Sequence, residues 1–141
     1  MMTEKYKILG KYIKDLSSET KDAETYIFVR ENISKYKLGI DITSKAIKNK
    51  MIEVNTAIKF EDKNENQKKS YFEIIFSTIV QIDNDIQDKK VMEKIILCDV
   101  QIEIYPDIEK TFLNLLHNSG YTGFKFEKKI DFEKLYTQRF N

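Results

Sequence analysis

Two carboxylates and a hydroxyl recur at every second position of the segment YIKDLSSE. In an extended strand, successive side chains alternate between the two faces. Asp15, Ser17 and Glu19 are therefore predicted to share one face. Tyr12 and Leu16 are predicted to share the other. A row of carboxylates at this spacing is either an ordinary solvated face or an acidic surface that docks a basic partner, and the segment alone leaves both interpretations open.

Few other residues suggest chemistry. Cys98 is the single cysteine and lies in an apolar run, which favours a buried thiol and excludes an internal disulfide or a cysteine-based zinc site. His117 is the single histidine and is expected in the last turn of a helix. Asp83 and Asp85 could suggest calcium, but the glycine and glutamate of an EF-hand loop are missing, so a turn is favoured. We expect no catalytic site, no metal and no cofactor, and hence not an enzyme.

Length and composition describe an ordinary globular chain. Its 141 residues predict one domain, 1–141. The 24 basic and 23 acidic side chains give a net charge of +1, which does not favour nucleic acid as a partner. The sequence has no run of about 18 apolar residues, so no direct membrane insertion is expected. The first residues lack the apolar core of a signal peptide, and a cytoplasmic location is expected.

Alternating hydrophobicity predicts strands over residues 36–42, 52–60 and 71–82, and residues 5–18 supply a fourth. A polar run, 61–69, is predicted to connect two of them. The link between the first two strands, residues 18–34, is long and partly apolar, which is often functional.

The pattern changes after residue 82. A helix is predicted from about 86–91 onward, although the alternation at 100–104 also fits a strand. Pro106 suits the first turn of a new helix, Gly120 its C-terminal cap, and Asp131 the cap of a last helix. Strands first and helices after predict an α+β fold, with a four-stranded antiparallel sheet and helices on one face.

The sequence is rich in apolar and aromatic side chains. The chain has 9 Phe and 8 Tyr but no Trp. One interpretation is a well-filled core with an oligomer interface, and the other is a groove for extended apolar peptide. For the groove we predict five residues: Tyr26, Phe28, Phe112, Leu116 and Phe126.

At this point the chain resembles the SecB family of bacterial protein-export chaperones over nearly its whole length. The segment IYPDIEKTFLNLLHNSGYTGFKFEKKIDFEKLYTQRF is similar to the family's C-terminal part. The matching positions there are Pro106, Gly120, Phe124, Asp131, Phe132, Leu135 and Tyr136. YIKDLSSE resembles the family's first-strand motif at Tyr12, Lys14, Asp15, Leu16, Ser17 and Glu19. YFEIIFSTIVQI resembles the fourth strand, with an acidic residue at Glu73.

The resemblance implies a homotetramer built as a dimer of dimers, with sheets outside and long helices between the dimers. It implies an ATP-independent chaperone, a holdase, that binds unfolded preproteins in apolar grooves and delivers them to the SecA motor. It also implies that the C-terminal tail of SecA docks on an acidic outer sheet surface. The matching positions here are Asp15, Glu19, Tyr71 and Glu73.

The sequence departs from the family in three respects. Prolines that precede the last helix are missing from GFKFEKKIDF, the overall charge is nearly neutral rather than acidic, and no acidic tail follows the last helix. These departures concern SecA coupling more than fold or peptide binding. Two alternatives therefore stay open: a solitary SecB-like chaperone of a toxin–antitoxin system, and a general holdase without SecA coupling.

Overall fold

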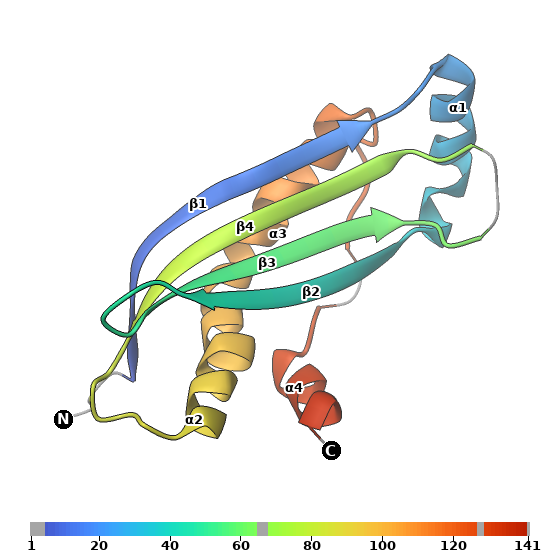
Figure 1. Ribbon diagram of the computed structural model, residues 1–141. Helices are drawn as coiled ribbons and strands as arrows, with labels where there is room; N and C mark the ends of the chain where they lie inside the picture. The colour runs from blue at the N-terminus through green and yellow to red at the C-terminus, as the bar shows by residue number, and fades with distance from the viewer. Residues whose placement is uncertain (1–4, 65–67, 127–128, 141) are drawn as a thin grey trace.

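The computed structural model describes residues 5–64, 68–126 and 129–140. Figure 1 shows a long curved sheet with helices against one side. In chain order the elements are β1 (Tyr6–Glu19), α1 (Ala23–Asn32), a 3-10 turn (Ile33–Lys35), β2 (Lys37–Ala46), β3 (Met51–Glu61), β4 (Tyr71–Ile82), α2 (Lys89–Lys94), a π-helical turn (Ile95–Asp99), α3 (Val100–Asn118) and α4 (Phe132–Phe140). Within the described residues, no helix is both long and apolar enough to cross a bilayer.

The four strands form one antiparallel sheet in the order β1-β4-β3-β2. The predicted alternation holds in β4, where Phe72, Ile74 and Val80 are buried on the face that α3 covers. The predicted α+β fold, with an antiparallel sheet and helices on one face, is confirmed. The predicted polar connection at 61–69 falls partly outside the described residues.

The alternation of β1 is interrupted by a register shift against β4 at Lys14. Such a bulge adds one residue and reverses the faces of the side chains that follow it. Leu16 pairs with Ile74, whose side chain faces the helices, whereas Tyr12 pairs with Ser77, three positions away on β4. Tyr12 and Leu16 therefore lie on opposite faces. The prediction that they share a face is wrong, because the bulge leaves no signal in the alternation of residue types.

Residues 89–118 form one continuous helical rod made of α2, the π-helical turn and α3. Residues 100–104 are helical, which excludes the strand that the sequence left open there. The prediction that Pro106 starts a new helix is wrong, because Pro106 lies inside α3. A proline inside a helix costs about 3 kcal/mol. Ile104, Ile108 and Phe112 on the same helix are almost fully buried. Burial stabilises each by about 1.5–3 kcal/mol, so together they outweigh the proline.

Gln101 joins this rod to the sheet through a buried polar contact. Its side chain is fully buried, and its Oε1 accepts a hydrogen bond from the Thr56 hydroxyl of β3 at 2.8 Å. Its Nε2 donates to the carbonyl of Ile96 in the π-helical turn at 3.1 Å. The altered backbone ladder of a π turn is therefore supported by a side chain that also binds the sheet.

Aromatic rings fill the end of the core nearest α1. Tyr36 packs against Phe60 and Phe72, with ring centroids 5.3 and 6.1 Å away. The remaining members of this aromatic cluster are Phe112, Tyr121, Phe124 and Phe126. Much of the aromatic surplus of the sequence is thus core, as the first of the two interpretations expects.

The Gln101 contact generates a test of how the rod is held. We expect Thr56→Val to lower the free energy of unfolding by about 1–3 kcal/mol, because it leaves the buried Oε1 of Gln101 without a donor. Adding Gln101→Met should cost less than the sum of the two single changes, since both polar partners are then replaced by apolar groups. Urea unfolding of the unaltered protein, the two single variants and the double variant measures this coupling. Strictly additive losses of stability would contradict it.

Candidate peptide-binding and docking surfaces

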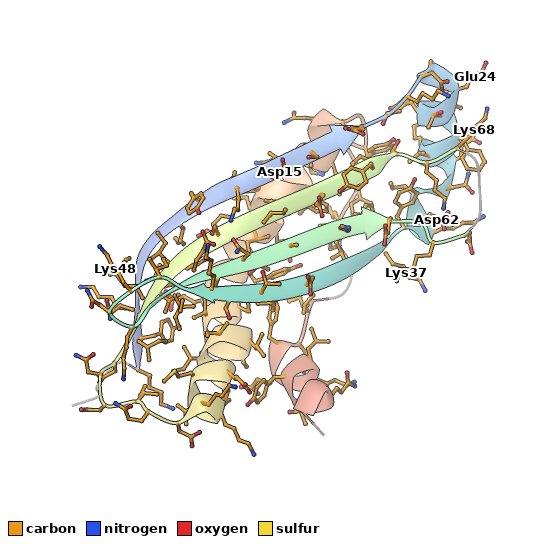
Figure 2. The ribbon with its side chains drawn as sticks, in the orientation of Figure 1. Asp15, Glu24, Lys37, Lys48, Asp62 and Lys68 are labelled. Atoms are coloured by element: carbon orange, nitrogen blue, oxygen red, sulfur yellow. The ribbon has the colours of Figure 1, made fainter. Side chains whose placement is uncertain are left out.

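Three carboxylates from two neighbouring strands meet on the outer face of the sheet. In β1, Glu19 pairs with Tyr71 of β4, and Ser17 pairs with Glu73. Asp15 accepts a hydrogen bond from the Ser17 hydroxyl at 2.7 Å and is exposed on β1 (Figure 2). The sequence-based prediction that Asp15, Ser17 and Glu19 share a face near Glu73 is thus correct. We call Asp15, Glu19, Tyr71 and Glu73 the acidic face.

The phenol of Tyr71 responds to the charge of this face. Its hydroxyl donates to Oε1 of Glu73 at 2.5 Å. This hydrogen bond, burial of the phenol, and the carboxylates of Glu73, Asp15 and Glu19, which repel the phenolate, together raise the pKa of Tyr71 to about 12. The negative potentials of all three carboxylates therefore add up at the Tyr71 hydroxyl. A docking surface that attracts a basic partner needs such a concentrated potential.

Lysines border the acidic face and offset part of its charge. Nζ of Lys59 on β3 lies 3.8 Å from Oε2 of Glu73. Lys14 and Tyr12 both contact Glu53, at 3.5 and 3.0 Å. In both pairs the lysine side chain is exposed, at 51% for Lys59 and 46% for Lys14, whereas the carboxylate side chain is largely covered, at 13% for Glu73 and 19% for Glu53.

The five residues predicted for a peptide groove divide into two groups. Phe112 and Leu116 are 1% and 0% exposed, so their side chains belong to the core and do not form an open surface. Tyr26, Phe28 and Phe126 are half-buried. The hydroxyl of Tyr26 donates to the carbonyl of Gly120, just beyond the end of α3, at 2.8 Å.

Two apolar grooves lie side by side, and Lys129 and Ile130 line both of them. The first, of about 410 Å3, runs along α3 and is also lined by Ile102, Tyr105, Pro106, Leu113 and Phe132. The second, of about 490 Å3, lies between β2 and α4. Its apolar lining is Leu38, Ile40, Ile130 and Leu135, and its polar lining is Lys129, Asp131, Lys134 and Gln138. The two grooves thus meet at Lys129 and Ile130 and combine apolar with charged side chains.

A model of the family described as preprotein translocase subunit SecB matches residues 2–141. The chain belongs to the SecB family. It is 64% identical over 140 residues to the putative protein-export protein SecB of Pelagibacter ubique, covering 99% of this chain and 100% of that one. A solved structure of a Mycobacterium tuberculosis SecB-like chaperone, in complex with a ChAD peptide from the HigA1 antitoxin, matches with a TM-score of 0.66. That match has 11% identity and covers 89% of this chain and 91% of the other, and it shows the shared fold.

Sequence reasoning missed most residues that line the grooves of this SecB-family chain. Leu38 and Ile40 fall in the alternating strand predicted over residues 36–42, and Leu135 falls in the predicted last helix. Both placements are compatible with core. In the structure Phe132 is buried but Leu135 is 45% exposed. The apolar stripe of α4 is thus wider than the surface that covers it. That excess width was the signal in the sequence that could have pointed to a groove.

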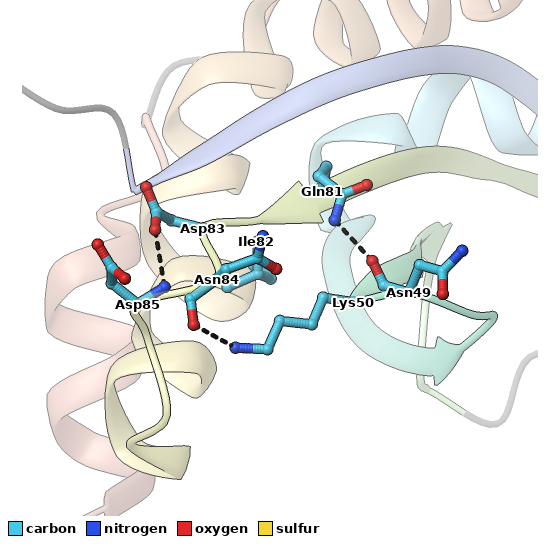
Figure 3. A pocket seen from close by; sticks show the side chains of 7 residues that line it. All are labelled: Asn49, Lys50, Gln81, Ile82, Asp83, Asn84 and Asp85. Carbon is cyan, nitrogen blue, oxygen red and sulfur yellow. Dashed lines mark hydrogen bonds between the residues drawn. The ribbon is translucent and has the colours of Figure 1, made fainter.

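A polar pocket of about 860 Å3 lies where the β2–β3 hairpin meets the end of β4 (Figure 3). Asn49 and Lys50 have positive φ angles of 50° and 60°. Nζ of Lys50 donates to the carbonyls of Asn84 and Ile86, both at 2.9 Å. The ammonium group therefore ties the β2–β3 hairpin to the loop that follows β4.

The residues considered for metal or thiol chemistry have structural contacts instead. The carboxylate of Asp83 accepts the N–H of Asp85 at 2.8 Å, which is the predicted turn (Figure 3). Among the described residues, no cluster of three His, Cys, Asp or Glu side chains could hold a metal. Cys98 is buried, as predicted, and burial raises the pKa of its thiol. Nε2 of His117 lies 2.9 Å from the carbonyl of Phe124.

The acidic face predicts a change in the titration of Tyr71. Glu73→Gln should move the pKa of Tyr71 from about 12 back toward the ordinary value near 10, because it removes a hydrogen-bonded carboxylate that opposes the phenolate. NMR of ring-labelled tyrosine at rising pH measures this. Asp41→Asn, on β2 two strands away from β4, is the matched control and should leave the pKa of Tyr71 unchanged. An equal shift in both variants would argue against a focused field.

Proposed function

We propose that this chain is an ATP-independent holdase that binds unfolded preproteins and serves their export. The observation that carries this proposal is the pair of apolar grooves on either side of Ile130, which run along α3 and beside β2. Membership of the SecB family and the relative named as a protein-export protein support the export role.

The exposed edge of β2 strengthens the proposal. β2 is the last strand of the sheet, with β3 as its neighbour among the described residues. At the hairpin, the N–H of Ile47 donates to the carbonyl of Met51 at 2.9 Å, and the register continues without a shift. Opposed residues in antiparallel strands alternate between pairs that hydrogen-bond to each other and pairs that do not. Counted from the bonded pair at Ile47, Leu38 and Ile40 belong to the second kind. Their N–H and C=O groups therefore point to the open edge. Their side chains line the groove, so an extended client can add a strand there.

Binding of this kind tolerates many client sequences. Apolar contact contributes roughly 25 cal/mol for each Å2 removed from water and requires no particular side chain. Backbone hydrogen bonds along an edge are likewise independent of sequence. We also propose Tyr26, Phe28 and Phe126 as client contacts outside the two grooves, with Phe112 stacked on Phe126 and Leu116 in the core.

For the acidic face we propose docking of the C-terminal tail of the SecA motor. Asp15, Glu19 and Glu73 are the groups that would attract a basic tail, and Tyr71 lies among them. A second candidate, a holdase without SecA coupling, is favoured by the position of Lys59 beside Glu73.

We also propose that the chain acts as a homotetramer, a dimer of dimers, in the cytoplasm, with residues 1–141 as one domain. Ile13 and Leu16 on the outermost strand β1 are 45% and 41% exposed, and Ile102 on α3 is 51% exposed. Apolar side chains on a free strand edge and on a helix favour association with further copies.

Client capture is tested by changing the β2–α4 groove. We expect Leu135→Glu to weaken capture of an unfolded preprotein at least about fivefold, since it replaces apolar contact with a charge that must lose water. The control is Ile47→Glu at the β2–β3 hairpin, because Ile47 is 47% exposed and Leu135 is 45% exposed. Suppression of aggregation, followed by light scattering without nucleotide, is the measurement. Failure of the unaltered protein to suppress aggregation would refute the holdase proposal.

Motor docking is tested by reversing charge on the acidic face. The double change Asp15→Lys and Glu19→Lys should weaken binding of a SecA-tail peptide, most strongly at low salt, because electrostatic steering is screened by ions. Client capture and assembly size should stay unchanged. The control reverses two exposed carboxylates elsewhere, Glu31→Lys and Asp85→Lys. If the unaltered protein binds no tail at low salt, the holdase without SecA coupling, or a solitary chaperone of a toxin–antitoxin system, is the better description.

A further inference from the structure

Lysines gather at the end of the sheet where β1 begins and the β2–β3 hairpin turns (Figure 1). Lys7 of β1 pairs with Gln81 of β4, which in turn pairs with Met51 at the foot of the hairpin. Neighbouring strands are about 5 Å apart, so Lys7 lies roughly 10 Å from Met51 on the same face. We call this end of the sheet the basic tip and define it by six exposed residues: Lys5, Lys7, Leu9, Lys45, Ile47 and Lys48.

Two large aliphatic side chains are exposed among these lysines. Leu9 and Ile47 are each 47% exposed. Leu9 lies where the register of β1 against β4 shifts, and Ile47 lies on the hairpin. Each follows a lysine two residues earlier in the chain, Lys7 and Lys45. The basic tip therefore presents cationic and aliphatic groups together.

The hairpin of the basic tip is braced by hydrogen bonds. The N–H of Met51 donates to the carbonyl of Lys48 at 2.7 Å. Nε2 of Gln81 donates to the carbonyl of Asn49, also at 2.7 Å (Figure 3). The ammonium group of Lys50 adds its two bonds to the loop after β4. The exposed side chains of the turn are therefore carried by a backbone that is fixed against the rest of the sheet.

The positive charge of the basic tip is only partly offset. None of its four lysines forms an ion pair with a described residue. Three carboxylates lie near it, those of Glu53, Asp83 and Asp85. Glu53 is largely covered and accepts hydrogen bonds from Tyr12 and Asn55. Together with the lysine that braces the hairpin, five ammonium groups stand against three carboxylates, which leaves a net charge of +2.

We propose that the basic tip docks on the surface of a bilayer that contains anionic lipid. Anionic headgroups attract the lysines, and Leu9 and Ile47 enter the boundary between headgroups and acyl chains. Such docking requires no helix that crosses the bilayer. A nucleic acid matches less well, because none of the six residues is an arginine or an aromatic that could stack on bases. The proposal does not depend on the holdase function.

The acidic face favours the same orientation on a bilayer. Figure 2 shows Lys48 at one end of the sheet and Asp15 nearer to the other. Glu19 and Glu73 lie with Asp15 toward the end that carries α1. An anionic surface attracts the basic tip and repels these carboxylates. A molecule docked through its basic tip therefore keeps the acidic face away from the lipid.

Vesicle flotation at low salt tests the docking. The unaltered protein should float with vesicles that contain roughly 30% phosphatidylglycerol, and not with vesicles of phosphatidylcholine alone. Lys45→Gln combined with Lys48→Gln should weaken this binding by roughly 5- to 30-fold, because each lysine near an anionic surface contributes about fivefold. Lys63→Gln combined with Lys69→Gln removes the same charge at the far end of β3 and β4 and is the matched control, which should bind as the unaltered protein does. Equal losses in the two double variants, or no binding of the unaltered protein to anionic vesicles, would overturn the proposal.

A further variant distinguishes a bilayer from a nucleic acid as the partner. Ile47→Ser removes an aliphatic side chain and no charge. It should weaken binding to the anionic vesicles by roughly 2- to 5-fold, because apolar contact with the lipid is lost. Binding to a single-stranded RNA probe, which depends on charge, should be weak and unchanged by this substitution. Vesicle binding that Ile47→Ser leaves unchanged, together with tighter binding to the RNA probe, would overturn the bilayer as the partner.

Discussion

The long helix formed by α2, the π-helical turn and α3 is held to one face of the sheet by a stripe of buried apolar side chains. Ile104 and Ile108 of α3 are fully buried, as are Ile74 and Val80 of β4. This contact tolerates a proline and a π turn in the same rod, and both would weaken an isolated helix. The long helix lies on this one face, and no described helix covers the outer face of the sheet (Figure 1).

Two surfaces of opposite character follow from that arrangement. On the inner side, β2 and α4 diverge and leave apolar side chains such as Leu38 and Leu135 along a groove. On the outer side, the alternation of each strand turns polar residues outward, and the register of β1 against β4 gathers Asp15, Glu19 and Glu73. The apolar surface results from incomplete coverage of the core side, whereas the acidic surface results from strand register.

Period-two alternation was sufficient to predict the strands, the α+β class and the shared face of Asp15 and Glu19, because each rests on local residue order. Tyr12 was misplaced because a bulge is set by pairing with the neighbouring strand. Pro106 was misplaced because tertiary burial outweighed a local helix-breaking preference. Leu116 was assigned to a groove because the sequence shows that a helix has an apolar stripe but not which residues of the stripe are covered by another helix or by the sheet.

The distribution of rigidity suits the two proposed roles. The acidic face is built on paired strands, so the spacing of its charges is set by the sheet, as electrostatic recognition requires. The groove beside β2 is bordered by α4, whose Leu135 is 45% exposed. An element with exposed apolar side chains can adjust to different polypeptides at little cost. Since the groove and the acidic face lie on opposite sides of one sheet, a bound client and a docked motor tail would not compete for area.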